Sequence, residues 1–310
     1  MVRGVRIGVV VAAIAAAFAI GSASALAYQP GSIGFDISYP QCGKTYPSNT
    51  RIGAPPAVTP HARFSTVRSL AAMTQVTRAD GTPPGSLSQS SASSNTRAST
   101  RPVAAVPRAF GIVGVDSGYP FMSLVHPGNP CMADEYAHSP NPALYVNTGY
   151  DPIYEQPDHT TPECTTKSQS LPTDGAHQRA WAVGCSEAQK DLTYVTQQGV
   201  VNPGGWWLDV ETGNSWSSDK TLNQYAIQGL IDTLRSSNAT PVGIYSNNYM
   251  WSTIVGSNPV TGQSADWYAT GLTTAQAAAP YCSSAYSFAG DPVKLAQFVV
   301  GGTIDRDLAC

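Results

Sequence analysis

The chain has 310 residues, with 17 Lys and Arg against 20 Asp and Glu, a net charge of −3 at neutral pH. This acidic balance gives no support for nucleic acid as a partner. No run after the first 27 residues approaches the roughly 20 apolar residues that a membrane span requires.

Residues 1–27 have the pattern of a secretory signal peptide. Arg3 and Arg6 precede an apolar run over residues 7–20, and small residues then lead to an A-x-A site that ends at Ala27. Removal of this leader leaves 15 basic and 20 acidic residues, a net charge of −5. We therefore expect a secreted, extracellular protein without a membrane span.

All six cysteines follow the leader, and an even number in an oxidising compartment favours disulfides. No two have the C-x-x-C spacing typical of zinc sites. Six cysteines can pair in many ways; we expect Cys42 with Cys131, Cys164 with Cys185, and Cys282 with Cys310.

Residues 51–108 differ in composition from the segments on either side. They contain seven Arg and a single acid, Asp80, together with long Ser, Thr, Ala and Pro tracts such as GSLSQSSASSNTRAST. Such a segment buries too little apolar surface to offset chain entropy, so we predict a disordered insertion. It divides one domain, formed by residues 28–50 and 109–310. The insertion either tethers the protein to anionic wall polymers or is a tolerated surface loop; the second is favoured because long loops cost little.

Short apolar segments with the character of strands recur along the domain. They are SIGFDIS (32–38), FGIVGVD (110–116), ALYVN (143–147), WWLDVE (206–211), PVGIYSN (241–247), ADWYA (265–269), KLAQFV (294–299) and GTID (302–305). Helical patterns over 176–199 and 220–238 lie between them. Eight strands with interposed helices predict an α/β fold of the (β/α)₈ type, a modified TIM barrel. A doubly wound open sheet is the alternative, but no strand is followed by a G-x-G-x-x-G turn.

Acidic residues end four of these segments. Asp36 lies near the end of the first, Asp116 ends the second, Asp209 and Glu211 end the fourth, and Asp305 ends the eighth. Strand alternation places Asp209 and Glu211 on one face, and the carboxyl ends of barrel strands meet at one mouth. Crowded acids that lose hydration have a raised pKa, and a protonated carboxyl can donate its proton to a leaving alcohol. Glycoside hydrolysis uses this chemistry.

Further side chains at the same mouth are candidates for contact with a substrate. We expect the aromatic rings among them to stack on sugar faces. The candidates are Trp207, Asp116, Tyr119, Asn147, Tyr245 and Trp267, with Trp216 as a further cleft residue.

Five segments, in this order, resemble glycoside hydrolase family 25 lysozymes: GFDIS (34–38), WLDVE (207–211), GIYSN (243–247), LAQF (295–298) and GTIDRD (302–307). GFDISYPQCG, WWLDVETGNSW and the Cys-rich ending are also similar to secreted actinobacterial glycoside-hydrolase-like proteins related to that family.

The resemblance implies a muramidase on a modified β/α barrel. It makes Glu211 the general acid/base, and Asp209 the nucleophile or the carboxylate that steadies a 2-acetamido group. Asp36 and Asp305 would position the sugar. The segments GIVGVDSGYPF and YVNTGYDP depart from the lysozyme pattern at the substrate cleft. The resemblance therefore supports the fold and the acid pair more than it supports peptidoglycan as the substrate.

Two alternatives to a lysozyme stay open: a non-catalytic carbohydrate- or wall-binding protein on the same barrel, and a hydrolase of another glycan. Other chemistries have less support, because the chain lacks a G-x-S-x-G elbow, an H-E-x-x-H motif and the spacing of a calcium loop. We expect a monomeric glycosidase that acts on a polysaccharide and has no cofactor and no metal.

Overall fold

The computed structural model describes residues 28–43, 108–123, 126–300 and 305–310. The predicted signal peptide lies outside these residues, as does the predicted insertion except for its last residue. Arg108, assigned to the insertion from the sequence, is the first residue of the second strand.

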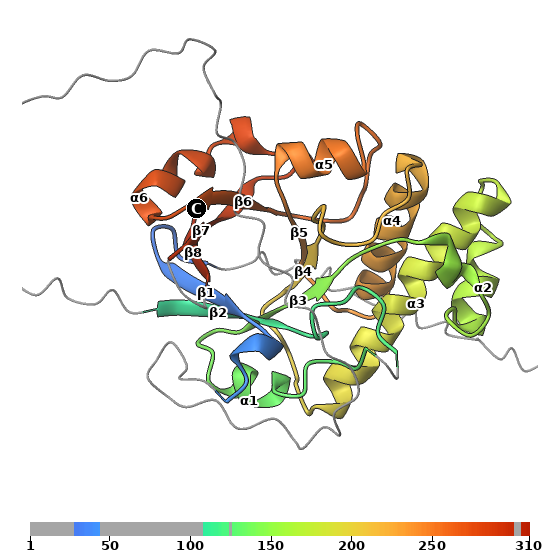
Figure 1. Ribbon diagram of the computed structural model, residues 1–310, viewed down its shortest axis with the longest axis horizontal. Helices are drawn as coiled ribbons and strands as arrows, with labels where there is room; N and C mark the ends of the chain where they lie inside the picture. Colours follow the sequence, from blue (N-terminus) through green and yellow to red (C-terminus); the bar gives the residue numbers. More distant parts are fainter. Residues whose placement is uncertain (1–27, 44–107, 124–125, 301–304) are drawn as a thin grey trace, which may run out of the picture.

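Eight strands close into one barrel, in which each strand pairs with its neighbours in sequence and the eighth pairs with the first (Figure 1). Seven of the eight predicted strands are present close to their predicted positions, and the eighth is shifted along the chain. The strands are β1 (Ile33–Ile37), β2 (Arg108–Gly114), β3 (Ala143–Asn147), β4 (Trp206–Asp209), β5 (Val242–Ser246), β6 (Asp266–Leu272), β7 (Val293–Val299) and β8 (Asp305–Ala309).

The barrel departs from a regular (β/α)₈ fold at its last strand. The pairs from β1–β2 to β6–β7 are parallel, whereas β8 runs antiparallel to both β7 and β1. A parallel return needs a crossover of roughly a dozen residues or more, and Val299 and Asp305 lie too close in the chain for one. The predicted eighth strand, 302–305, is therefore corrected to Asp305–Ala309, while 302–304 lie outside the described residues.

The helices cover the outside of the barrel, with α3 and α4 on one side and α5 and α6 along another (Figure 1). The α-helices are α1 (Met132–Ala137), α2 (Pro162–Ser168), α3 (Gly175–Gln197), α4 (Lys220–Ser236), α5 (Asn248–Ile254) and α6 (Ala275–Ala278). Short 3₁₀ turns are η1 (Tyr39–Gln41), η2 (Pro152–Glu155), η3 (Ala279–Cys282) and η4 (Ser284–Tyr286). The two longest helices, α3 and α4, confirm the helical patterns seen in the sequence.

The backbones of α3 and α4 come into contact at Gly184, where an added Cβ atom would lie 1.8 Å from the Ala226 carbonyl oxygen.

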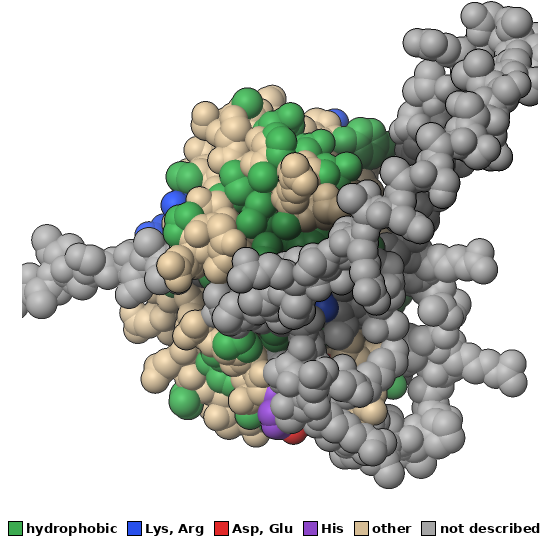
Figure 2. All heavy atoms as spheres, turned by 90° about the vertical axis from the view of Figure 1, so that its left-hand side faces the viewer, with side chains coloured by type: hydrophobic (Ala, Val, Ile, Leu, Met, Phe, Trp, Pro, Cys, Tyr) green, Lys and Arg blue, Asp and Glu red, His purple; other side chains and the backbone are tan. Residues whose placement is uncertain are grey.

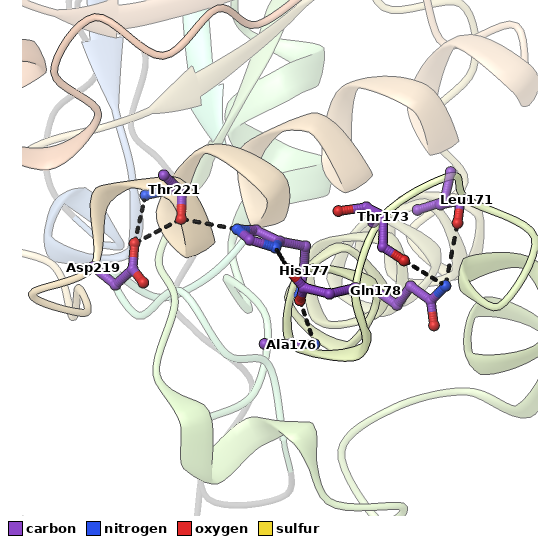
Figure 3. Close-up of polar contacts among 8 residues, drawn as sticks. Leu171, Thr173, Ala176, His177, Gln178, Asp219 and Thr221 are labelled. Atoms are coloured by element: carbon purple, nitrogen blue, oxygen red, sulfur yellow. Dashed lines mark hydrogen bonds and ion pairs between the residues drawn. The ribbon is translucent and has the colours of Figure 1, made fainter.

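A polar network joins the N-termini of α3 and α4. Asp174 caps α3 and Asp219 caps α4. His177 lies beside Thr221, which in turn contacts Asp219 (Figure 3). The His177 ring is 2.7 Å from Asp174 Oδ2 and 2.9 Å from Thr221 Oγ1, and the Thr221 hydroxyl donates to Asp219 Oδ1 at 2.6 Å. The Asp–His–Thr order resembles a nucleophile triad. Because the hydroxyl proton is directed at Asp219, however, the network joins two helix caps and does not activate a nucleophile.

The three predicted disulfides are all present. Cys42–Cys131 joins the segment after β1 to the start of α1, Cys164–Cys185 joins α2 to α3, and Cys282–Cys310 joins η3 to the residue after β8. Each bond limits the freedom of the unfolded chain and so favours the folded barrel.

The inside of the barrel is filled by a layer of large apolar side chains near the amino ends of the parallel strands. Phe110, Trp207 and Trp267 belong to this layer, which we call the aromatic floor. The Trp207 indole N–H donates to the hydroxyl of Tyr28 at 3.1 Å, and the Tyr28 ring packs on Phe110. Gly243 faces the same layer, where an added Cβ would lie 2.3 Å from the Trp207 ring. The floor closes the barrel beneath its mouth.

One face of the molecule carries few charges (Figure 2). On the face that includes α6, hydrophobic and uncharged polar side chains predominate, and charged side chains occur only at scattered points (Figure 2). Within the described part of the chain, no helix combines the length and apolar character of a membrane-crossing segment.

Candidate active site

The structure brings the predicted acids together at the carboxyl end of the parallel strands. Asp36 on β1 lies opposite Asp305 on β8 in the antiparallel register. Asp209, the last residue of β4, lies between Asn147 on β3 and Tyr245 on β5. We call the carboxyl groups at this end of the barrel the acid layer; they are Asp36, Asp116, Asp209, Glu211, Asp305 and Asp307.

Asp307 belongs to this layer but was missed in the sequence. It lies on β8 beside Gly34 and Gln297, and it is fully buried. Its carboxyl group faces the side chains of Asp36 and Trp267. Burial raises the pKa of Asp307 well above its usual value, and the charges of Asp36 and Asp305 add to this. The D-x-D spacing of Asp305 and Asp307, like that of Asp209 and Glu211, indicates two acids on one strand face.

Asp36 is held by a short chain of hydrogen bonds. The Tyr245 hydroxyl donates to Gln297 Oε1 at 2.8 Å, and Gln297 Nε2 donates to Asp36 Oδ2 at 3.0 Å. Burial raises the pKa of Asp36 to about 7, and the charge of Asp305 adds to the rise. Burial therefore favours the protonated form of Asp36.

Asp209 is the most crowded acid of the mouth. Asp209 is 7% exposed. Its Oδ2 atom accepts a hydrogen bond from Asn147 Nδ2 at 2.7 Å. Burial raises the pKa of Asp209 well above its usual value, and the charges of Glu211, Asp116 and Asp36 raise it further.

Glu211 lies two residues beyond Asp209, in the turn that leads to α4. The turn is fixed by Trp216 Nε1, which donates to the Glu211 carbonyl oxygen at 2.8 Å, and by Asn214 Nδ2, which donates to the Asp209 carbonyl oxygen at 3.0 Å. Burial raises the pKa of Glu211. Glu211 is nevertheless more exposed than Asp209, so of the two it is the carboxyl more open to a substrate.

The residues expected to bind substrate divide into accessible and closed positions. Tyr119 is 39% exposed and stacks on His126 with ring centroids 3.9 Å apart, while Tyr245, Trp216 and Asn147 are half-buried. The remaining three candidates are closed to solvent: Trp207, Trp267 and Asp116 are 0%, 2% and 3% exposed.

These closed positions correct the expected roles of the two tryptophans. Trp207 and Trp267 are part of the aromatic floor, with ring centroids 5.6 Å apart, and offer no face to a sugar. Alternation placed Trp207 on the inward face correctly, but its position two residues before Asp209 puts it below the mouth.

Among the residues that the structure describes, no group of three or more His, Cys, Asp and Glu side chains is arranged to hold a metal ion. A surface groove lined by Met122, Leu192 and Tyr194 lies beside α3 and includes none of the acid layer.

Part of the chain is similar to lysozyme-like proteins. Residues 182–290 match the family model described as Lys-1, lysozyme-like protein 1. This segment contains Asp209 and Glu211 but not Asp36, Asp116 or Asp305.

The curated relative "probable GH family 25 lysozyme 5" of Dictyostelium discoideum is 39% identical over 64 residues. The match covers 20% of this chain and only 30% of the relative. Among solved structures, a glycosyl hydrolase 25 of Streptococcus pneumoniae, described as a virulence factor participating in host cell invasion, aligns with a TM-score of 0.39 and 14% identity. That alignment covers 66% of this chain and 77% of the other.

Proposed function

We propose that the chain is a secreted glycosidase that hydrolyses a glycosidic bond in peptidoglycan or another extracellular polysaccharide. The observation that carries the proposal is the pair Asp209 and Glu211 at the end of β4, within a layer of acids from β1, β2 and β8. Burial raises the pKa of both members of the pair. Two carboxyl groups with raised pKa at the mouth of a barrel suit acid/base cleavage of a sugar chain.

Glu211 is the general acid in this proposal. Because burial raises its pKa, the carboxyl keeps its proton at a higher pH than a free glutamic acid does. Its greater exposure lets it reach the glycosidic oxygen, to which it donates the proton as the bond from C1 breaks. The resulting Glu211 carboxylate then takes a proton from the water that completes hydrolysis.

Asp209 stabilises the positive charge that develops on the sugar ring. It acts either as the nucleophile at C1 or as the carboxylate that orients a 2-acetamido group of the substrate. Asn147 fixes Oδ2, while Oδ1 has no hydrogen-bond partner among the described residues. The developing positive charge favours the ionised form of Asp209 and so offsets the cost of its burial.

Asp36 and Asp305 position the sugar. With its pKa raised to about 7, Asp36 can present a proton to a sugar hydroxyl, and Gln297 fixes the orientation of its other oxygen. Tyr119 supplies an exposed ring against which a sugar face can stack.

A non-catalytic carbohydrate- or wall-binding protein is the second candidate. Burial of Asp116 and the presence of Asn147 at the end of β3 support it, since both lie in segments that depart from the lysozyme pattern. The presence of the whole acid layer favours the enzyme, because binding alone does not require acids with raised pKa.

The test is the release of new reducing ends from peptidoglycan and a panel of other polysaccharides. We expect the parent protein to cleave at least one of them, and Glu211→Gln to reduce turnover at least about 100-fold by removing the proton donor. Glu163→Gln is the matched control, because Glu163 lies on α2 and pairs with Lys167 at the surface. Equal activity in Glu211→Gln contradicts the assignment, and binding without cleavage by the folded parent supports the second candidate.

A further inference from the structure

Asn147 connects two buried carboxyl groups that lie on different strands. Its backbone N–H donates to Asp116 Oδ2 at 2.8 Å, and its side-chain Nδ2 donates to Asp209 Oδ2 at 2.7 Å. Asp116 is 3% exposed and Asp209 is 7% exposed. One residue at the end of β3 thus holds an acid that follows β2 and an acid of β4 in fixed positions.

We infer that Asn147 is a positioning residue that couples Asp116 to Asp209, so that the charge on Asp116 controls whether Asp209 holds a proton. Asp116 and Asn147 then act behind the site and do not contact the sugar. The catalytic meaning of this coupling rests on the proposed function, but the coupling itself is a property of the folded protein.

Buried oxygen atoms without a hydrogen-bond donor indicate that one of the two carboxyl groups holds a proton. Asp116 Oδ1, Asn147 Oδ1 and Asp209 Oδ1 are all buried, and none has a hydrogen-bond partner within the described residues. All three atoms are acceptors when both carboxyl groups are ionised, and a buried acceptor without a donor is costly. A proton on either carboxyl group supplies a donor to the linked residues and removes one of two buried charges.

Backbone donors favour Asp116 as the member that holds the charge. The N–H of Asn147 donates to its carboxyl group, and the backbone of Gly118 also faces it. Backbone N–H groups stabilise an ionised carboxylate. Asp209, by contrast, faces the acids Glu211 and Asp36 as well as Asp116, and these charges favour its protonated form.

Other titratable groups surround the pair. Glu187 and Asp191, both buried on α3, face Asp116, and Lys190 pairs with Glu187 at 2.6 Å. The phenols of Tyr145 and Tyr245 lie within the field of the acids at the mouth. Asn147 nevertheless hydrogen-bonds to both Asp116 and Asp209, and the experiment therefore targets it.

The coupling is measured by ¹³C NMR titration of the Asp209 carboxyl carbon in the folded, disulfide-bonded protein. Asp116→Asn removes the charge but keeps an oxygen that accepts from the Asn147 N–H. We expect the Asp209 midpoint to fall by about one pH unit or more in this variant, because one buried negative charge has been removed. Asp266→Asn is the control: Asp266 is a buried acid on β6 that accepts from Phe288 and Ala289, and its loss leaves the Asp209 midpoint unchanged.

Asn147→Ala provides a second, independent test. It keeps the backbone bond to Asp116 and removes the side-chain donor to Asp209, so the Asp209 midpoint rises. With a cleaved glycan as substrate, kcat falls about 10- to 100-fold with little change in KM, and the acid limb of the pH profile moves with the NMR midpoint. An unchanged Asp209 midpoint in folded Asp116→Asn or Asn147→Ala overturns the inference.

The titration needs no turnover, so the two proposals fail separately. If the midpoints move as expected and the parent protein cleaves no glycan, the coupling stands and the glycosidase proposal fails. If the parent protein cleaves a glycan and the midpoints do not move, only the coupling is overturned.

Discussion

The inside of the barrel has two layers with opposite chemistry, built from the same strands. On β4, Trp207 lies in the aromatic floor and Asp209, two residues further on, lies in the acid layer. Both side chains point inward, because alternate residues of a strand share a face. The comparison shows that alternation selects the inward face, whereas the position along the strand decides between packing and chemistry.

Each layer depends on the other. The floor closes one end of the barrel to water, so the acids above it lose hydration and their pKa values rise. The acids in turn lower the stability of the fold, because a buried carboxyl without full hydrogen bonding is costly. We therefore expect substitutions in the floor to lower stability, and substitutions in the acid layer to lower activity without lowering stability.

The largest expected effect on stability comes from the floor. Trp207→Ala removes a fully buried ring that contacts Tyr28 and Trp267. We expect the free energy of unfolding to fall by about 3–5 kcal/mol, the usual cost of such a cavity. Urea unfolding measures this loss. Tyr249→Ala is the control, because Tyr249 is 73% exposed and its removal changes stability by only about 0.5 kcal/mol or less. Equal losses in the two variants contradict the assignment of Trp207 to the floor.

The acids give stability a pH dependence with a defined sign. Burial raises the pKa of Asp36, Glu135 and Glu187 to about 7, above the values of free carboxyl groups. The unfolded chain loses these protons first, so the free energy of unfolding is higher near about pH 5 and falls, by a few kcal/mol in total, as the pH rises through about 7. Urea unfolding at several pH values measures the slope. Glu187→Gln should make the slope shallower, and stability that rises over this range contradicts the prediction.

A smaller effect is expected in the hydrogen-bond chain that orients Asp36. Tyr245→Phe removes the hydroxyl that donates to Gln297 and leaves Gln297 free to turn away from Asp36. We expect a loss of about 1 kcal/mol in the free energy of unfolding and a several-fold fall in kcat on a cleaved glycan. Tyr249→Phe, at the exposed position on α5, is the control. A Tyr245→Phe variant with unchanged kcat removes Tyr245 from the positioning of Asp36.

Much of the fold could be predicted from local pattern. The strands and the two long helices follow from apolar alternation and helical periodicity. An even number of cysteines predicts disulfides but leaves many pairings open, and the structure confirms the expected one. The antiparallel direction of β8 was missed, although the short distance between the last two strand segments, 294–299 and 302–305, already excluded a parallel return.

The site could be predicted only in part. Asp36, Asp209, Glu211 and Asp305 were chosen because they lie at strand ends, and the structure brings them together. Asp307 was not predicted because it lies beyond the end of the expected eighth strand, 302–305, whereas the observed strand continues to Ala309. The roles of Trp207 and Asp116 depend on depth inside the closed barrel and on a hydrogen bond from Asn147, and neither can be read from a single strand.

The most direct test of the two-layer account compares Glu211→Gln with Trp207→Ala in one experiment. Initial rates of reducing-end release, per folded molecule, and the free energy of unfolding are measured for both variants and the parent. The account predicts that Glu211→Gln loses activity and keeps its stability, while Trp207→Ala loses stability and keeps most of its activity per folded molecule. Full activity in Glu211→Gln would contradict the account.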